Sequence, residues 1–140
     1  MSRNSWAATV ATLAVIVVTV LGLRALGGPG RQRLVQSDLR TVRTLGQLAQ
    51  QITFTWNGSG KVLPANLEKF PNAMKQDLFT GQPFRYRPKS TSEYELCATF
   101  STDSRNLPTQ NGNDFWAHPQ GDYCFALDAS QPVPPVPYLY

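Results

Sequence analysis

The residues from Trp6 to Leu23 constrain this chain most, because they form an uninterrupted apolar run. The run reads WAATVATLAVIVVTVLGL and contains no charged residue. About 20 apolar residues at ~1.5 Å rise each cross the ~30 Å hydrocarbon core of a bilayer. Only a helix satisfies the backbone of a single span inside lipid. The run therefore predicts one transmembrane helix, with Trp6 and Arg24 as anchors at the membrane interfaces.

Two other interpretations of this run stay open. A cleaved signal peptide would use Arg3 as its basic start, but its apolar part is usually only ~7–15 residues long. The segment LRALG at 23–27 is also a poor cleavage site. A buried core helix is the third interpretation, and a small domain rarely hides a helix that is apolar all round. The pattern favours an uncleaved anchor over both alternatives.

Composition limits what the rest of the chain can be. Without the anchor, the 140 residues leave one small domain, whose modest core benefits from extra fastening. The net charge of +4 is mild, and five arginines cluster between Arg24 and Arg43 with only Asp38 opposing them. Arg24, Arg31 and Arg33 are predicted to contact anionic headgroups or an acidic partner. Basic and aromatic residues do not interleave, so nucleic-acid binding is not expected.

The two cysteines, Cys97 and Cys124, bear on the compartment. Outside the cytoplasm they would most simply form one disulfide, which closes a loop of about 27 residues and contributes ~3 kcal/mol. Two buried free thiols are the alternative. The arginines after the anchor oppose an extracytoplasmic domain, because the side richer in Lys and Arg tends to stay in the cytoplasm. The anchor and the small domain favour the disulfide.

The first half of the soluble part is predicted to be mainly helical. The GGPG at 27–30 indicates a hinge. Apolar residues recur at helical spacing over 31–53, which predicts a long amphipathic helix. This helix packs on the sheet of its own domain or, alternatively, lies on the bilayer. FTWNGSG at 54–60 predicts a turn, and Pro64 opens a predicted short helix over 64–70.

The second half is predicted to be a small sheet followed by an extended tail. Strands are expected over 84–87, 93–100 and 123–127, and the first two are expected to pair as an antiparallel hairpin. Residues 77–83 predict a turn that leads into the first strand, and residues 101–114 predict a long polar loop. The proline-rich end at 131–140 predicts polyproline II. The expected divisions are an anchor at 1–26, a hinge at 27–30, an α+β domain at 31–130 and a tail at 131–140.

The order of these segments resembles a known family. GKVLPANL at 60–67, DLFTGQPFRY at 77–86 and YEL at 94–96 follow a membrane helix and a long amphipathic helix. This resembles the type II secretion pseudopilins and related type IV pilin-like proteins over residues 31–100. The resemblance implies a pilin-like α+β domain, one long helix on a small antiparallel sheet. It also implies a bacterial inner-membrane protein with its domain on the periplasmic side.

The chain departs from the pilin pattern at its N-terminus. No acidic residue occurs before Asp38, no Gly-Phe junction is present, and 27–30 interrupts the helix that pilins keep continuous. These departures argue against prepilin cleavage and filament formation. Some pseudopilins hold calcium in a late loop, where this chain has Asp103, Asn113 and Asp114. These three residues lack a recognisable ligand pattern, so no calcium is expected.

Residues capable of catalysis are few. His118 is the only histidine and lacks the neighbours that a zinc site needs, so a surface or hydrogen-bonded histidine is expected. Glu93 and Glu95 share one strand face. Cross-strand pairing with Arg85 and Arg87 is a simpler role for them than acid–base work in a cleft. The sequence therefore predicts no enzyme, no metal, no cofactor and no small-molecule substrate.

Aromatic residues near the C-terminus suggest a contact surface. Phe115, Trp116, Tyr138 and Tyr140 would serve as partner anchors, since exposed aromatic side chains are favoured in interfaces. A preformed proline-rich segment also binds at a low ordering cost. The alternative, equally weighted, is that both segments fold back over their own sheet.

The resulting hypothesis is a structural or accessory subunit of a larger membrane protein complex, with an energy-transducing complex as one candidate. Its expected partners are the lipid bilayer and the other subunits. A minor pseudopilin of a secretion or pilus system is the second hypothesis. An enzyme that uses Glu93, Glu95 or His118 is the third.

Overall fold

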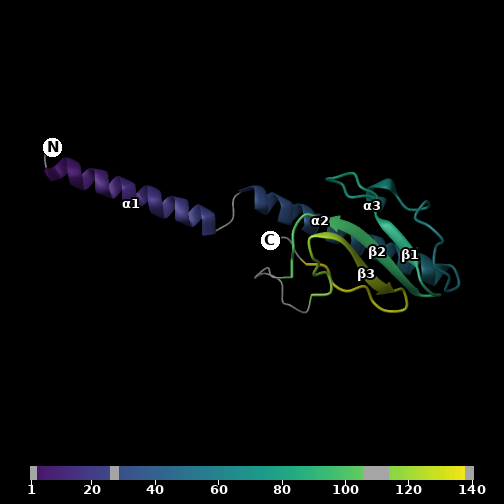
Figure 1. The fold of residues 1–140 in the computed structure, drawn as a ribbon. Helices are drawn as coiled ribbons and strands as arrows, with labels where there is room; N and C mark the ends of the chain where they lie inside the picture. Colours follow the sequence, from purple (N-terminus) through teal and green to yellow (C-terminus); the bar gives the residue numbers. More distant parts are fainter. Residues whose placement is uncertain (1–2, 26–28, 106–113, 138–140) are drawn as a thin grey trace. The chain divides into compact units, whose positions relative to one another are not determined.

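The computed structural model describes residues 3–25, 29–105 and 114–137 of the chain. The described elements are three helices and three strands, so the α+β class is confirmed. The chain divides into two compact units, Met1–Arg33 and Leu34–Tyr140, which are considered separately below. Figure 1 shows the elements in chain order. The Tyr138 and Tyr140 of the predicted contact surface lie outside the described residues.

Helix α1 (Arg3–Ala25) contains the whole apolar run. The side chains from Trp6 to Arg24 are exposed, so none of the apolar surface is covered within the described residues. Two threonine hydroxyls on the helix donate to carbonyls one turn earlier, Thr12 to Ala8 at 2.9 Å and Thr19 to Val15 at 2.8 Å. Their polar atoms are thereby satisfied within the helix, as a lipid environment requires.

Helix α2 (Pro29–Gly58) is the longest element and begins earlier than expected. Pro29 is its first residue, where a proline costs nothing because the first N–H groups of a helix have no intrahelical partner. Gly30 is also helical. The last two residues of the hinge expected over 27–30 are therefore helical, and its first two lie outside the described residues.

Helix α2 also ends later than expected. The turn predicted over 54–60 is wrong for residues 54–58, which continue the helix. Trp56 explains the extension: its ring is buried, and its indole N–H donates to the carbonyl of Thr91 at 2.9 Å. Lys61 then lies over the same ring, 4.1 Å from its centroid. Tertiary contacts of one large side chain thus outweigh the turn propensity of Asn57 and Gly58.

The short helix predicted over 64–70 is absent from the described structure. That segment is irregular and contributes the buried side chains of Leu67 and Phe70 to the core. Pro71 follows directly, and a residue before proline is disfavoured in the helical region. The helix forms after the proline instead, as α3 (Asn72–Lys75).

The sheet is a three-stranded antiparallel meander in the order β1-β2-β3. Strands β1 (Arg85–Pro88) and β2 (Glu93–Phe100) form the expected hairpin, with Arg87 opposite Glu95. Strand β3 (Gly121–Asp128) pairs with β2 so that Cys124 lies opposite Cys97. Both pairings agree with the sequence, because alternation of polar and apolar residues fixes which strand face is buried.

One face of the sheet packs on α2, which passes behind the strands in Figure 1. The alternating residues of β2 that face the helix are all buried, and so are the α2 residues that meet them. This confirms a packing role for the amphipathic helix in its own domain. The core residues shared by α2 and the sheet include Val42, Leu45, Leu48, Ile52, Tyr94, Leu96, Phe100, Phe125 and Leu127.

The described part of the tail, residues 131–137, folds back onto the domain. It contains no helix or strand, and Val133 and Val136 pack against the core. The indole N–H of Trp116 donates to the carbonyl of Pro134 at 3.1 Å. A Cβ placed on Gly46 of α2 would lie only 2.4 Å from Cγ1 of Val136. The tail thus crosses α2 where the absence of a side chain permits close approach.

Candidate functional site

The membrane-spanning candidate is the first part of the site. Among the described residues, one helix is long and apolar enough to cross a bilayer, over the 19 residues Trp6–Arg24. At 1.5 Å per residue this length is about 28 Å, close to the hydrocarbon thickness. Length and composition are the only support for this role, and a signal sequence near the N-terminus would show both. An uncleaved membrane anchor stays a prediction.

The predicted arginine contacts lie on either side of the junction between α1 and α2. Arg24 is in the last turn of α1, and Arg31 and Arg33 are in the first turns of α2. All three side chains are exposed to solvent. A cation in the last turn of a helix also interacts favourably with the carbonyl end of the helix dipole. Their contact with headgroups or an acidic partner stays a prediction.

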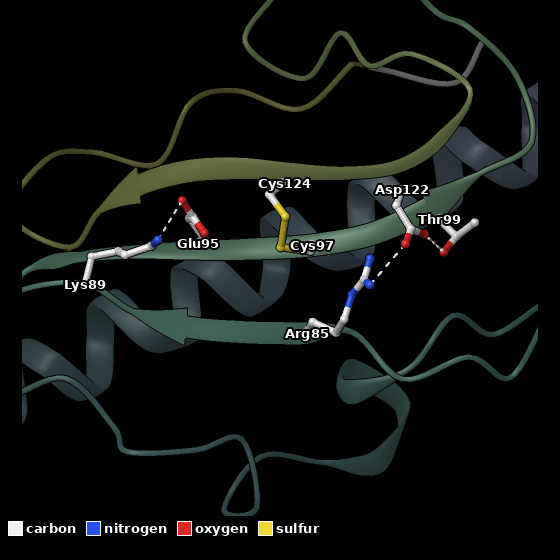
Figure 2. Close-up of a disulfide and its surroundings, with 7 residues drawn as sticks. All are labelled: Arg85, Lys89, Glu95, Cys97, Thr99, Asp122 and Cys124. Carbon is white, nitrogen blue, oxygen red and sulfur yellow. Dashed lines mark hydrogen bonds and ion pairs between the residues drawn. A yellow bond between two sulfur atoms is a disulfide. The ribbon is translucent and has the colours of Figure 1, made fainter.

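The outer face of the sheet, turned away from α2, carries the cysteine pair (Figure 2). The sulfur atoms of Cys97 and Cys124 are 2.05 Å apart, which is the distance of a disulfide bond. The bond joins the middle strand to β3 at directly opposed positions. The predicted pairing is therefore the one that the structure contains, with a sequence separation of 27. The redox compartment remains part of the proposal below.

Two ion pairs flank the disulfide, and their partners differ from the prediction (Figure 2). Arg85 of β1 reaches across β2 to Asp122 of β3, with 3.1 Å between the charged atoms. Lys89, just after β1, lies 3.3 Å from Glu95. The expected partners of Arg85 were the β2 glutamates, but the register places Arg85 opposite Cys97. Its long side chain therefore pairs with a carboxylate on the third strand.

Hydrogen bonds lower the pKa of two carboxyl groups, Asp122 on the outer face and Asp103 in the loop after β2. The Thr99 hydroxyl donates to Asp122 at 2.5 Å, and this bond together with Arg85 lowers the pKa of Asp122. Arg105 similarly donates to Asp103 and lowers the pKa of that carboxyl to about 2. Both carboxylates are anionic acceptors at neutral pH. Their surroundings are those of solvated ion pairs rather than of a catalytic acid.

Three residues of types that can bind metals also meet on this face. A carboxylate oxygen of Glu95 and the sulfurs of Cys97 and Cys124 lie within 4.8 Å of one another. Metals bind cysteine as the thiolate, and both sulfurs are bonded to each other here. The trio therefore lacks the donor set of a zinc or calcium site while the disulfide is intact.

His118 is buried rather than on the surface. Its ring stacks on Phe100 with 3.7 Å between centroids, and its backbone N–H donates to the Ser104 hydroxyl at 2.9 Å. The ring nitrogen Nδ1 lies 3.2 Å from the carbonyl oxygen of Pro119. Burial lowers the pKa of His118 and favours the neutral imidazole. The ring is a hydrogen-bonded core residue, which matches one of the two expected settings.

Of the aromatic residues predicted to contact a partner, Trp116 is buried and Phe115 is exposed. Trp116 is 0% exposed and packs against Phe125, with 4.9 Å between ring centroids. This corrects its assignment to a partner contact, because the ring already contacts the core and the tail. Phe115 is 39% exposed, and its role in partner binding stays a prediction. The burial of Trp116 could not be predicted from its local sequence, since its hydrogen-bond acceptor is Pro134, 18 residues later.

Sequence reasoning missed two buried carboxylates that fasten loops to α2. Asp38 accepts backbone N–H groups from Ser101 at 3.0 Å and from Thr102 at 2.7 Å. Asp77 accepts the hydroxyl of Thr41, one helical turn after Asp38. Polar residues on the apolar stripe of an amphipathic helix are the signal that could have found both, because a buried polar side chain needs a partner.

The residues 77–81, called the Asp77 turn below, present two large apolar side chains to solvent. Leu78 is 72% exposed and Phe79 is 71% exposed. The sequence prediction recognised a turn here but gave these side chains no role. A pocket beside this turn, lined by Phe84, Arg85 and other residues, has room for about one water molecule. It is too small for a metabolite.

Comparison with family models, with curated proteins and with solved structures finds no match for this chain.

Proposed function

We propose that this protein is a non-enzymatic, single-pass membrane subunit that braces or docks onto a larger membrane protein complex. The observation that carries the proposal is that one chain contains both the exposed apolar helix α1 and a compact domain. The side chains of α1 are uncovered from Trp6 to Arg24, whereas the sheet and α2 share a closed core. A helix with an apolar surface on all sides is stable in lipid and not in water.

The domain is suited to a structural role by its fastenings. The Cys97–Cys124 bond and the Arg85–Asp122 pair join neighbouring and non-neighbouring strands on the outer face. Hydrogen bonds of Asp38 and Asp77 also fasten the segment after β2 and the Asp77 turn to α2. Two of the three candidate catalytic residues have structural roles, since His118 is buried and Glu95 pairs with Lys89. An energy-transducing complex is one candidate host.

The location follows from the same features. The proposal places the domain on the periplasmic side of a bacterial inner membrane, because a disulfide persists in an oxidising compartment. A membrane-impermeant thiol reagent applied to intact spheroplasts tests this. Labelling of Cys97 and Cys124 from outside, only after reduction, supports the periplasmic side. Labelling without reduction, and only after lysis, overturns it in favour of the cytoplasm.

A minor pseudopilin is the second candidate function. The observation in its favour is the order of elements, a long helix followed by an antiparallel three-stranded meander that packs on it. The pilin-like description extends the resemblance seen over residues 31–100. A mature N-terminus trimmed near α1 would favour this function, and an intact Met1 would weigh against it.

Purification of the tagged full-length protein from native membranes in mild detergent tests the main proposal. A stoichiometric complex that withstands high salt is expected, and mass spectrometry then identifies its other subunits. A chain that purifies alone would contradict the subunit role. Association with secretion components only would transfer the proposal to the pseudopilin function. An unrelated single-pass protein with the same tag serves as the control for non-specific association.

A further inference from the structure

The Asp77 turn holds its exposed apolar pair rigidly. The carboxylate oxygen Oδ1 of Asp77 accepts the N–H groups of Phe79 at 2.7 Å and Thr80 at 2.9 Å. The other oxygen accepts the Thr41 hydroxyl from α2. Gly81 closes the turn through a 2.7 Å bond to the Asp77 carbonyl, with a φ of 70° that favours glycine. The exposure of Leu78 and Phe79 is therefore a property of a fixed turn.

Further apolar and cationic residues lie on α2, near Thr41, and at the end of α3 just before the turn. Leu34, seven residues before Thr41, lies on the same face of α2 and is 40% exposed. Arg40 precedes Thr41 and is exposed. Lys75 ends α3 just before the turn, and its carbonyl accepts the N–H of Phe84 at 2.7 Å. The half-buried Lys75 thus precedes Leu78 by three residues, and Arg40 precedes the residue of α2 that holds the turn. Apolar side chains at the tip of the turn, combined with cations, suit a bilayer surface, which has acyl chains beneath anionic headgroups.

The size of the tip decides between a bilayer and a protein as the contact. A stable protein interface buries about 800 Å² on each partner, far more than two side chains supply. A membrane contact needs much less affinity if the chain is already anchored, because the anchor keeps the turn at a high effective concentration near the lipid. The tip is therefore sufficient for lipid and insufficient for an independent protein partner.

We infer that the Asp77 turn is a second membrane contact, in which Leu78 and Phe79 enter the interface of the bilayer and Lys75 and Arg40 bind anionic headgroups. This inference rests on the proposed function, because it requires α1 to be the anchor. Thr41 lies about 18 Å along α2 from Pro29, at 1.5 Å per residue. The turn is therefore near enough to the anchor along the chain to meet the same bilayer.

A single-cysteine probe tests the contact in the full-length protein. The two native cysteines are bonded to each other, so a cysteine introduced by Phe79→Cys is the one reactive thiol. It is labelled with an environment-sensitive fluorophore and reconstituted in vesicles of phosphatidylcholine with phosphatidylglycerol that contain a lipid-borne quencher. Val62→Cys is the matched control, because Val62 is also largely solvent-exposed and follows the C-terminal end of α2.

The expected result is a blue-shifted, quenched label at position 79 and an aqueous, unquenched label at position 62. Adding Lys75→Glu and Arg40→Glu to Phe79→Cys should reduce the quenching. Resistance of every variant to alkaline extraction checks the anchor separately. A label at 79 that stays aqueous while α1 remains inserted overturns the inference alone, whereas extraction of the chain overturns the proposed function. Shielding at 79 only when other membrane proteins are present would assign the turn to a protein and overturn the inference.

Discussion

The carboxylate oxygen Oδ2 of Asp38 accepts two hydrogen bonds from Thr102, one from its backbone N–H at 2.7 Å and one from its hydroxyl at 2.6 Å. The other oxygen accepts the N–H of Ser101 at 3.0 Å. Asp38 is on α2, and the donor residues Ser101 and Thr102 directly follow β2. This single side chain thus fixes the end of the central strand to the helix.

Replacing Asp38 should destabilise the domain strongly. Asp38→Ala removes a buried, charged acceptor and leaves two backbone N–H groups without their partner, so we expect a loss of roughly 3 kcal/mol of unfolding free energy. Chemical unfolding of the full-length protein in mild detergent measures this loss. Gln36→Ala is the matched control, because Gln36 is exposed on the same helix, and it should change stability little.

Thr102→Val gives a graded check on the same contact. It removes the hydroxyl donor but keeps the backbone bond, so a loss of about 1 kcal/mol is expected. A stability of Asp38→Ala equal to that of the wild type would show that the loop does not depend on this carboxylate.

Gly46 should be intolerant of a side chain although alanine is the better helix former. A Cβ there would lie 2.4 Å from Cγ1 of Val136 and 3.8 Å from Cζ2 of Trp116. We expect Gly46→Ala to displace the tail and to cost roughly 1–3 kcal/mol of unfolding free energy, typical of overpacking. Faster hydrogen exchange of the Trp116 indole N–H, which donates to the Pro134 carbonyl of the tail, would report the displacement.

A double mutant and a matched glycine control this experiment. Val136→Ala removes the clashing methyl group, so Gly46→Ala combined with Val136→Ala should recover tail protection relative to Gly46→Ala alone. Gly30, on the same helix, has no atom within 4 Å of its added Cβ. Gly30→Ala should therefore be neutral or stabilising, by up to about 1 kcal/mol. Equal effects at both glycines would refute the role of the tail contact.

The elements that the sequence predicted best are those determined by local pattern. β2 was predicted over 93–100 and has those bounds, because EYELCATF alternates along its whole length. β3 and β1 were each predicted within two residues of their observed ends. The long helix was predicted from its apolar stripe, but its end at Gly58 was not, because Trp56 packs on the segment around Thr91.

The elements that it predicted wrongly depend on contacts between distant residues. The partner of Arg85 could not be read from the hairpin alone, since Asp122 lies on a third strand. Trp116 was assigned to a partner contact because exposed aromatic residues are favoured in interfaces, whereas its contacts come from β3 and the tail. The Asp77 turn was recognised from its glycine and the proline that follows. The exposure of Leu78 could not be predicted, because it depends on the hydrogen bond that Asp77 accepts from Thr41 of α2.

Breaking the disulfide should lower stability without changing the fold. The Cys97–Cys124 bond closes a loop with a sequence separation of 27. The chain-entropy relation for such a loop gives about 3.5 kcal/mol, through the greater freedom of the reduced unfolded chain. Unfolding with and without a thiol reductant measures the difference. The variant with both cysteines changed to serine should match the reduced wild type and show no response to reductant. A reductant-independent wild type would contradict the bond.

Acidification should destabilise the domain through His118 in a definable range. The groups that face its ring or influence its charge are Phe100, Ser104, Pro119, Thr102 and the carboxylates of Asp38 and Asp103. Burial is the largest influence and lowers the pKa of His118, while the two carboxylates oppose it. In the unfolded chain the group returns to its ordinary pKa of about 6.5.

The sign of the pH effect follows from proton counting. Between the lowered folded pKa of His118 and about 6.5, the unfolded chain binds more protons, so stability rises with pH. The contribution is complete above about pH 6.5 and is lost as the pH falls below that value. Asp122, whose pKa is lowered by Thr99 and Arg85, loses its contribution only at lower pH, near and below the ordinary aspartate pKa of about 4.

Measuring unfolding free energy from about pH 7 to about pH 5 separates these groups, because histidine titrates in that range and ordinary carboxylates do not. The wild type should lose stability across the range. His118→Asn removes the titrating ring, so its stability should be lower at neutral pH, where the stack on Phe100 is lost, but nearly constant with pH. The matched variant Asp122→Asn should keep the wild-type slope in this range. Parallel slopes for the wild type and His118→Asn would show that the buried imidazole does not determine the acid response of the fold.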